Sequence, residues 1–154
     1  MPNRDSQHAI GNGGGVSPQP PEPAVLDQRF DGNGLYALRA AVSAHAAMSG
    51  APDHVVEDVV VIANELASNA VRHGGGNGRL LMWRNATAVH CRVIDRGPGM
   101  STAPTTVGTH RAPPRAPGGR GLWIVRQLSH NLDVATGPEG TTVTATVLLD
   151  NVQA

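Results

Sequence analysis

Three polar residues stand four positions apart in one stretch of the sequence: Glu65, Asn69 and His73. In an α-helix this spacing places the side chains along one strip, and the strip borders an apolar face that includes Ile62 and Leu66. A carboxamide oxygen is a suitable ligand for Mg²⁺, and a carboxylate can orient or deprotonate an attacking hydroxyl group. The strip is therefore suited to line a cleft, but a solvated helix edge would carry the same residues.

A second candidate is Asp95, which ends a Val- and Ile-rich stretch and opens the turn Asp95-Arg96-Gly97-Pro98-Gly99. Its carboxylate could accept a hydrogen bond from an exocyclic amine such as that of adenine. Gly97 and Gly99 would let the backbone pass close to a ligand. Because Asp, Gly and Pro are also common turn residues, the motif alone favours an ordinary strand-ending turn.

Two further motifs stand beside predicted elements. Gly119-Arg120-Gly121-Leu122 comes just before a predicted helix, and the backbone N–H groups of a helix N-terminus form a natural phosphate site, to which Arg120 could add a charge-assisted contact. The spacing fits neither the P-loop nor the dinucleotide-binding pattern, and a helix that follows a flexible loop is the alternative. Gly140-Thr141-Thr142 opens a predicted strand. Threonine has a high β propensity, so the two threonines could be there only because they favour a strand.

Hydrophobic periodicity predicts the elements that position these motifs. Helices are predicted over 35–48, 51–73 and 121–130. Strands are predicted over 24–30, 79–84, 87–95, 132–136 and 141–149. The stretch 96–119 has no periodicity, and such a loop is usually a lid, a binding loop or disordered. The order predicts an α/β (α+β) two-layer sandwich, in which about three helices cover one face of a mixed, mostly antiparallel sheet.

Length and composition indicate one compact domain. The chain has 154 residues, and we expect a disordered tail over 1–23, which nearly lacks large apolar side chains, followed by a folded domain over 24–150. The formal net charge is zero, which argues against non-specific binding to nucleic acid or to an anionic membrane. The single cysteine, Cys91, forms no intrachain disulfide and is expected to be a buried thiol. No stretch resembles a signal sequence or a membrane span, so we expect a cytoplasmic protein.

Each motif is weak, but their order and spacing together resemble the four nucleotide boxes of the gyrase, histidine kinase and mismatch-repair ATPase superfamily. The resemblance covers about residues 24–149, and it is strongest to the anti-sigma-factor serine kinases, which are free-standing domains of this size. The resemblance rests above all on the amino-acid sequence of two segments, from Glu65 to Gly74 and from Gly119 to Val125. The resemblance implies a domain that binds ATP and Mg²⁺, with residues 101–118 as the lid.

The resemblance also implies a role for each motif residue. Glu65 would serve as the catalytic base, and Asn69 would coordinate a Mg²⁺ ion that bridges the phosphates. Asp95 would bind the adenine amino group, with support from Thr142. The other residues assigned to nucleotide binding are His73, Gly97, Gly99, Gly119, Arg120, Gly121 and Leu122.

Anti-sigma serine kinases hold a sigma factor in check and phosphorylate a serine on an anti-anti-sigma (STAS-type) partner. The resemblance implies the same activity here, with Arg39 at the partner surface, and it suggests a homodimer. One alternative is a module that sequesters a sigma factor in a nucleotide-dependent way without kinase turnover. A detached histidine kinase catalytic domain fits less well, because histidine kinases usually carry Asn at the position of Glu65 and no dimerisation helix pair precedes the ATP boxes.

Overall fold

The computed structural model describes residues 10–11, 17–21, 24–100 and 119–150. Its strands form a six-stranded sheet in the order β1-β5-β6-β4-β3-β2, and each pairing among the described strands is antiparallel. The strands are β1 (Ile10–Gly11), β2 (Leu26–Asp31), β3 (Asn77–Arg84), β4 (Ala88–Asp95), β5 (Asn131–Gly137) and β6 (Gly140–Leu148). The helices are the short 3₁₀ helix η2 (Gly32–Gly34), α1 (Leu35–Met48), α2 (Asp53–His73) and α3 (Gly119–Leu128).

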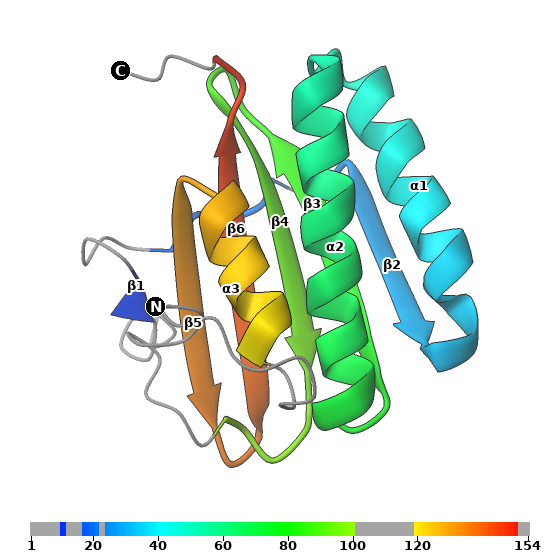
Figure 1. Ribbon diagram of the computed structural model, residues 1–154, viewed down its shortest axis with the longest axis vertical. Helices are drawn as coiled ribbons and strands as arrows, with labels where there is room; N and C mark the ends of the chain where they lie inside the picture. Colours follow the sequence, from blue (N-terminus) through cyan, green and yellow to red (C-terminus); the bar gives the residue numbers. More distant parts are fainter. Residues whose placement is uncertain (1–9, 12–16, 22–23, 101–118, 151–154) are drawn as a thin grey trace.

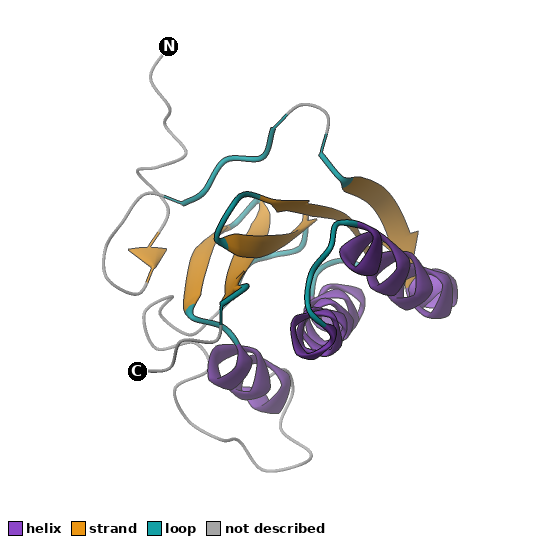
Figure 2. Ribbon diagram, turned by 90° about the horizontal axis from the view of Figure 1, so that it is seen from above, coloured by secondary structure: helices purple, strands orange, loops and turns teal. Residues whose placement is uncertain are grey.

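The three α-helices lie on the same face of the sheet (Figure 1) and form a separate layer when seen from above (Figure 2). Helix α2 lies between the other two and contacts both of them, together with β3, β4 and β6. This arrangement confirms the predicted two-layer α/β sandwich. Among the described helices, none is long and apolar enough to cross a membrane.

Helix α2 carries Glu65, Asn69 and His73 on the border of its buried stripe. The buried residues follow three- and four-residue spacing: Val55, Val59, Ile62, Ala63, Leu66, Ala67 and Ala70. Asp53 in the first turn and Arg72 in the last turn carry charges that the helix dipole favours at those ends. The helix therefore holds the polar strip at a fixed height above the sheet.

Alternation along the strands decides which residues face the helices. On β4 the core residues are Val89, Cys91 and Val93. Burial raises the pKa of the Cys91 thiol to about 12, and this confirms the prediction of a buried thiol, which stays protonated at neutral pH. The same alternation places Asp95, two residues after Val93, on the side of the helices.

Part of the segment that we predicted to be disordered contacts the sheet. Ile10–Gly11 pairs with β5, and the Arg92 side chain donates hydrogen bonds to Ser17 Oγ and Pro18 O. Arg92 points away from the helices, because its neighbour Val93 lies in the core, and Figure 2 shows loop segments before β2 on that face of the sheet. The composition argument did not predict these contacts, because it considers only the burial of apolar side chains.

Candidate functional site

The predicted site residues come from elements whose ends meet at one end of the sheet. Helix α2 ends at His73, β4 ends at Asp95 and α3 begins at Gly119. Figure 1 shows these three ends together at the bottom of the view, beside the turn between β5 and β6. The predicted lid, residues 101–118, lies outside the described residues. The site is therefore built from the described ends of α2, β4, α3 and the β5–β6 turn.

Gly74, directly after α2, lies against the side chain of Asp95. A Cβ atom at Gly74 would overlap the carboxylate of Asp95. A Cβ atom at Gly97 would lie 2.5 Å from Gly74 Cα and 2.6 Å from Gly74 C. The turn after β4 thus packs its backbone directly on the end of α2, which only glycine permits at this separation. These two glycines bring the carboxylate of Asp95 to the helix that carries Asn69.

Asp95 is half-buried and accepts hydrogen bonds from two backbone groups. Gly97 N donates to Oδ1 at 2.9 Å, and the backbone N–H of Thr141 donates to the same carboxylate. Burial raises the pKa of Asp95, and the two N–H donors act in the opposite direction. Because an ionised carboxylate offers about four acceptor positions, Asp95 keeps capacity for a further donor such as an amine.

Thr141, rather than Thr142, lies beside Asp95. In the register of β4 and β6, Asp95 pairs with Thr141 and Ile94 pairs with Thr142. Thr141 is buried at 6% exposure on the side of the helices, and Thr142 belongs to the opposite face because neighbouring strand residues alternate. We assigned the supporting role to Thr142 from the sequence, and the structure places Thr141 there instead, since a shift of one residue reverses the face.

Glu65 lies next to the start of α3. A Cβ atom at Gly121 would lie 2.6 Å from Glu65 Oε1 and 3.6 Å from Glu65 Cδ, so the carboxylate fills the space that a side chain at residue 121 would take. Gly119 and Arg120 belong to the same first turn of α3, whose backbone N–H groups have no partner within the helix. Leu122 is buried at 7% exposure and anchors this turn in the core.

Asn69 lies one helical turn from Glu65 and one turn from His73. Its Oδ1 atom is buried and has no hydrogen-bond partner among the described residues. An unsatisfied buried acceptor costs about 1–3 kcal/mol, and a cation or a donor on a ligand would recover that cost. A neutral amide oxygen fits Mg²⁺, which prefers oxygen ligands. Within the described ranges, no group of three or more His, Cys, Asp or Glu side chains is arranged to hold a metal ion.

The site has two chemically different ends along α2. Glu65 faces the N-terminus of α3 at one end, Gly74 contacts Asp95 at the other, and Asn69 lies between them. The helix axis from residue 65 to residue 74 measures about 13 Å. A helix N-terminus favours an anion, and a carboxylate favours an amine. The site therefore suits an elongated ligand with an anionic group at one end and an amine at the other.

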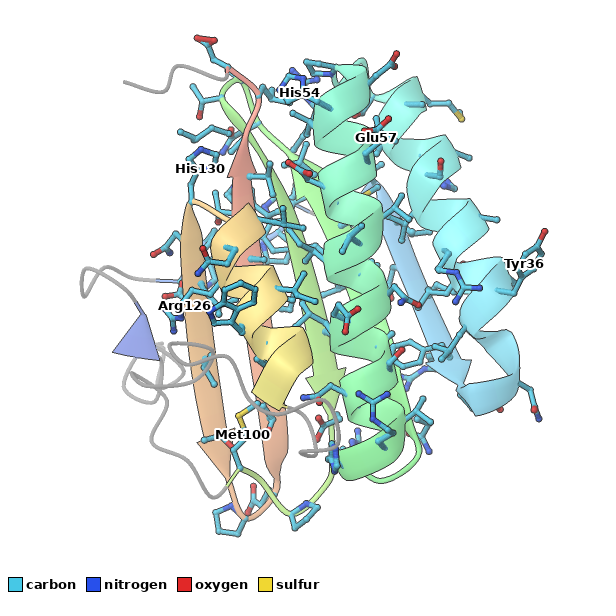
Figure 3. The ribbon with its side chains drawn as sticks, viewed as in Figure 1. Tyr36, His54, Glu57, Met100, Arg126 and His130 are labelled. Atoms are coloured by element: carbon cyan, nitrogen blue, oxygen red, sulfur yellow. The ribbon has the colours of Figure 1, made fainter. Side chains whose placement is uncertain are left out.

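The two remaining predicted residues are His73 and Arg39. His73 is exposed in the last turn of α2. Arg39 lies at the contact between α1 and α2, where its Nη1 atom donates a 3.0 Å hydrogen bond to Asn64 Oδ1. Its guanidinium group also lies over the ring of Tyr36, which is 78% exposed and points away from the sheet (Figure 3). Arg39 thus belongs to the outer surface of the helix layer.

Sequence reasoning missed two residues that build the site, Gly74 and Thr141. Gly74 opens the run Gly74–Gly76 directly after α2, and we used it only as the last residue of the motif that begins at Glu65. A run of three glycines next to a polar helix strip is also a signal for close backbone contact. Thr141 could be separated from Thr142 only through the cross-strand register, which the two identical residues do not reveal.

Comparisons with known proteins agree with this geometry. Residues 31–147 match the family described as the histidine kinase-like ATPase domain. No curated protein gave a match. The fold is similar to the crystal structure of the RsbU and RsbW domains of Rv1364c from Mycobacterium tuberculosis, with 22% identity, a TM-score of 0.56 and coverage of 80% of this chain. The match spans only 32% of that chain, about a third of its length.

A second solved structure, a histidine kinase domain from the Erythrobacter litoralis EL346 blue-light activated histidine kinase, is 18% identical. Its TM-score is 0.47, and the match covers 73% of this chain and 64% of that one. At 22% identity, the similarity to the Rv1364c structure is evidence for the fold alone. The family match is the finding that bears on what the site holds.

Proposed function

Because the chain belongs to the histidine kinase-like ATPase family, we propose that it binds ATP with Mg²⁺ and transfers phosphate to a serine of a partner protein. The partner would be an anti-anti-sigma protein of the STAS type, and the chain would hold a sigma factor in check. The observation that carries this proposal is the order of groups along α2: Glu65 beside the first turn of α3, Asn69 with an unpaired oxygen, and Gly74 against Asp95.

The adenine end is assigned to Asp95. Its carboxylate would accept a hydrogen bond from the exocyclic amine of adenine, while Gly97 N and the backbone N–H of Thr141 hold it in place. Gly97 and Gly99 keep the turn free of side chains at this point, and Gly99 has a φ of +91°, which glycine adopts most easily. A base without an exocyclic amine at this position would leave the carboxylate without that partner.

The phosphate end is assigned to Asn69 and the first turn of α3, residues 119–122. The backbone N–H groups of that turn would donate to phosphate oxygens, and Asn69 Oδ1 would supply the chain's ligand to the cation. When bound, Mg²⁺ would neutralise charge on the phosphate groups. The residues near Asp95 and those near Glu65 would thus hold the two ends of one nucleotide.

Glu65 is assigned as the general base. Its carboxylate would take the proton of a partner serine hydroxyl as the serine Oγ bonds to the γ-phosphorus, and the bond to the β–γ bridging oxygen breaks to release ADP. The position of Glu65 Oε1 beside Gly121 supports this role, because it lies at the turn assigned to the phosphates. Phosphoryl transfer needs mainly positioning and charge stabilisation, which this set of residues could supply.

The partner surface is assigned to the outer side of α1 and α2 around Arg39. Its guanidinium is held by Asn64 Oδ1 and the Tyr36 ring, so its direction is set before a partner arrives. A homodimer and a cytoplasmic location remain part of the proposal. The alternative, a module that sequesters a sigma factor in a nucleotide-dependent way without turnover, draws on the same nucleotide site and differs only in the chemical step.

A phosphotransfer assay tests the function. A STAS-type protein captured by the full chain in the presence of ATP is incubated with labelled ATP and the wild type, or with Glu65→Gln. We expect Glu65→Gln to bind ATP with wild-type affinity and to transfer label about 100-fold more slowly or worse, since a general base contributes at least that factor.

The matched control is Glu57→Gln, because Glu57 is an exposed glutamate on the same helix, two turns before Glu65 (Figure 3). Its transfer rate should equal that of the wild type. Equal rates for Glu65→Gln and wild type would remove the base assignment. Nucleotide-dependent partner binding with no labelled serine in the wild type would select the sequestering module.

A further inference from the structure

A chain of hydrogen bonds crosses the end of three neighbouring strands beneath the proposed adenine end. Thr136, near the end of β5, pairs with Thr141 at the start of β6, and their hydroxyl oxygens lie 2.8 Å apart. The backbone N–H of Thr141 donates in turn to the Asp95 carboxylate at the end of β4. Thr136 is thus linked to the carboxylate through a single intervening residue.

The same hydroxyl group of Thr136 also holds the turn that follows Asp95. Met100 N donates a 2.9 Å hydrogen bond to Thr136 Oγ1. A Cβ atom at Gly99 would lie 3.2 Å from Thr136 Oγ1 and would overlap Gly137 O, so the backbone of the turn passes directly over the end of β5. The turn is therefore fixed twice, by Asp95 at Gly97 N and by Thr136 at Met100 N.

We propose that Thr136 is a positioning residue for the adenine end of the site. Its hydroxyl group joins the turn 96–100 to Thr141 and so sets the direction in which the Asp95 carboxylate faces the base. The inference rests on the proposed function, because it presumes that Asp95 receives an amine of a nucleotide. It places no contact between Thr136 and the nucleotide itself.

This role predicts a particular pattern of affinity loss. Thr136 is joined to Thr141 and to Met100 N, and none of the described hydrogen bonds joins it to Asn69 or to the first turn of α3, so its hydroxyl should matter equally for ADP and ATP and equally with and without Mg²⁺. Removal of one hydrogen-bonding hydroxyl that orients the pocket should weaken binding by about 3- to 10-fold. A residue that acted at the phosphate end would show a loss that depends on Mg²⁺ and on the γ-phosphate.

The experiment compares three variants of the full chain by calorimetric titration with ADP and with ATP, each with and without Mg²⁺. Thr136→Val removes the hydroxyl and keeps the shape, and Thr136→Ser restores the hydroxyl. Thr87→Val is the control, because Thr87 also donates a hydroxyl hydrogen bond, to Asn85 Oδ1 at 3.2 Å, in the turn between β3 and β4 at the other end of the sheet. We expect an equal loss in all four titrations for Thr136→Val, recovery in Thr136→Ser and wild-type affinity in Thr87→Val.

Unchanged affinity of a folded Thr136→Val, or a loss seen only with Mg²⁺, overturns the inference while the proposed function stands. A wild type that takes up neither nucleotide overturns the proposed function, and the inference with it. If Thr136→Val does not fold, amide hydrogen exchange of the wild type decides: exchange at Met100 N should slow when ADP binds. Exchange at Met100 N that ADP leaves unchanged overturns the inference as well.

Discussion

Replacement of Gly97 by alanine is expected to destabilise the fold and to abolish nucleotide binding. The new Cβ atom would lie 2.5 Å from Gly74 Cα and 2.6 Å from Gly74 C. Both are backbone atoms that cannot rotate away, so the turn after β4 and the end of α2 must separate. Overpacking of this kind lowers the free energy of unfolding by about 1–3 kcal/mol. The same separation would carry Asp95 away from α2, and both effects are measured by thermal unfolding and calorimetric titration with ATP.

Gly137→Ala is the matched control for Gly97→Ala. A Cβ atom at Gly137 would meet no atom within 4 Å, and its φ is outside the left-handed region. The residue also lies at the same end of the sheet, in the last position of β5. We expect wild-type stability and wild-type nucleotide affinity from this variant. A Gly97→Ala protein that unfolds at the wild-type temperature and binds ATP normally would contradict the backbone contact as described.

The second large effect is expected from Asp95→Asn, which should lose nucleotide affinity without losing stability. The asparagine Oδ1 atom can still accept from Gly97 N, as the Asp95 Oδ1 atom does. The other side-chain position, however, becomes an N–H₂ donor that faces the amine of the base. Two opposed donors leave a buried group unsatisfied, and we expect affinity for ATP to fall by about 10- to 100-fold.

The pKa of Asp95 explains why we expect Asp95→Asn to keep the stability of the wild type. Burial raises it above the ordinary value of 3.8, so the folded state binds the proton more readily than the unfolded state does. The free energy of unfolding of the wild type therefore falls as the pH rises through the window between 3.8 and the raised value. Asp95→Asn lacks this titration, so above that window it should unfold at the wild-type temperature or higher.

The nucleotide affinity of the wild type should also depend on the ionisation of Asp95, but it should rise with pH, whereas the free energy of unfolding falls. The amine needs the ionised carboxylate, so affinity for ATP should fall as the pH is lowered through the raised pKa of Asp95, at a higher pH than for an exposed aspartate. Asp95→Asn should bind weakly with no such dependence. Titrations at a series of pH values between about 4 and 7 check both. Tight, pH-independent binding by Asp95→Asn would show that this carboxylate does not receive the base.

The sequence predicts most of the fold because the residues that start and end the helices lie next to them in the chain. The bounds of α1, Leu35–Met48, agree with the sequence prediction, since Gly34 and the Ser49-Gly50 pair mark both ends. Helix α3 begins two residues before the predicted start at residue 121. The reason is that Gly119 has a low intrinsic helix propensity, and a propensity argument therefore assigns it to the loop.

The parts of the site that could not be predicted depend on contacts between distant segments. The approach of Gly97 to Gly74 and the pairing of Asp95 with Thr141 are set by strand register and by the packing of α2. The contacts of Ser17 and Pro18 with Arg92 are polar and join residues far apart in the chain. Neither periodicity nor turn chemistry carries information on such pairs, whereas the residue types at positions 65, 69 and 95 are visible in the sequence itself and suggest the chemistry that we propose.

The central claim is that one ATP molecule lies between Asp95 and the first turn of α3, with Asn69 as the chain's ligand to Mg²⁺. Calorimetric titration of the folded full chain with ATP, with and without Mg²⁺, tests it most directly. The account predicts saturable uptake of a single nucleotide per chain, tighter with Mg²⁺, and Asn69→Ala should lose only the increment that Mg²⁺ provides. The absence of any nucleotide uptake by the folded wild type, in either condition, would contradict it.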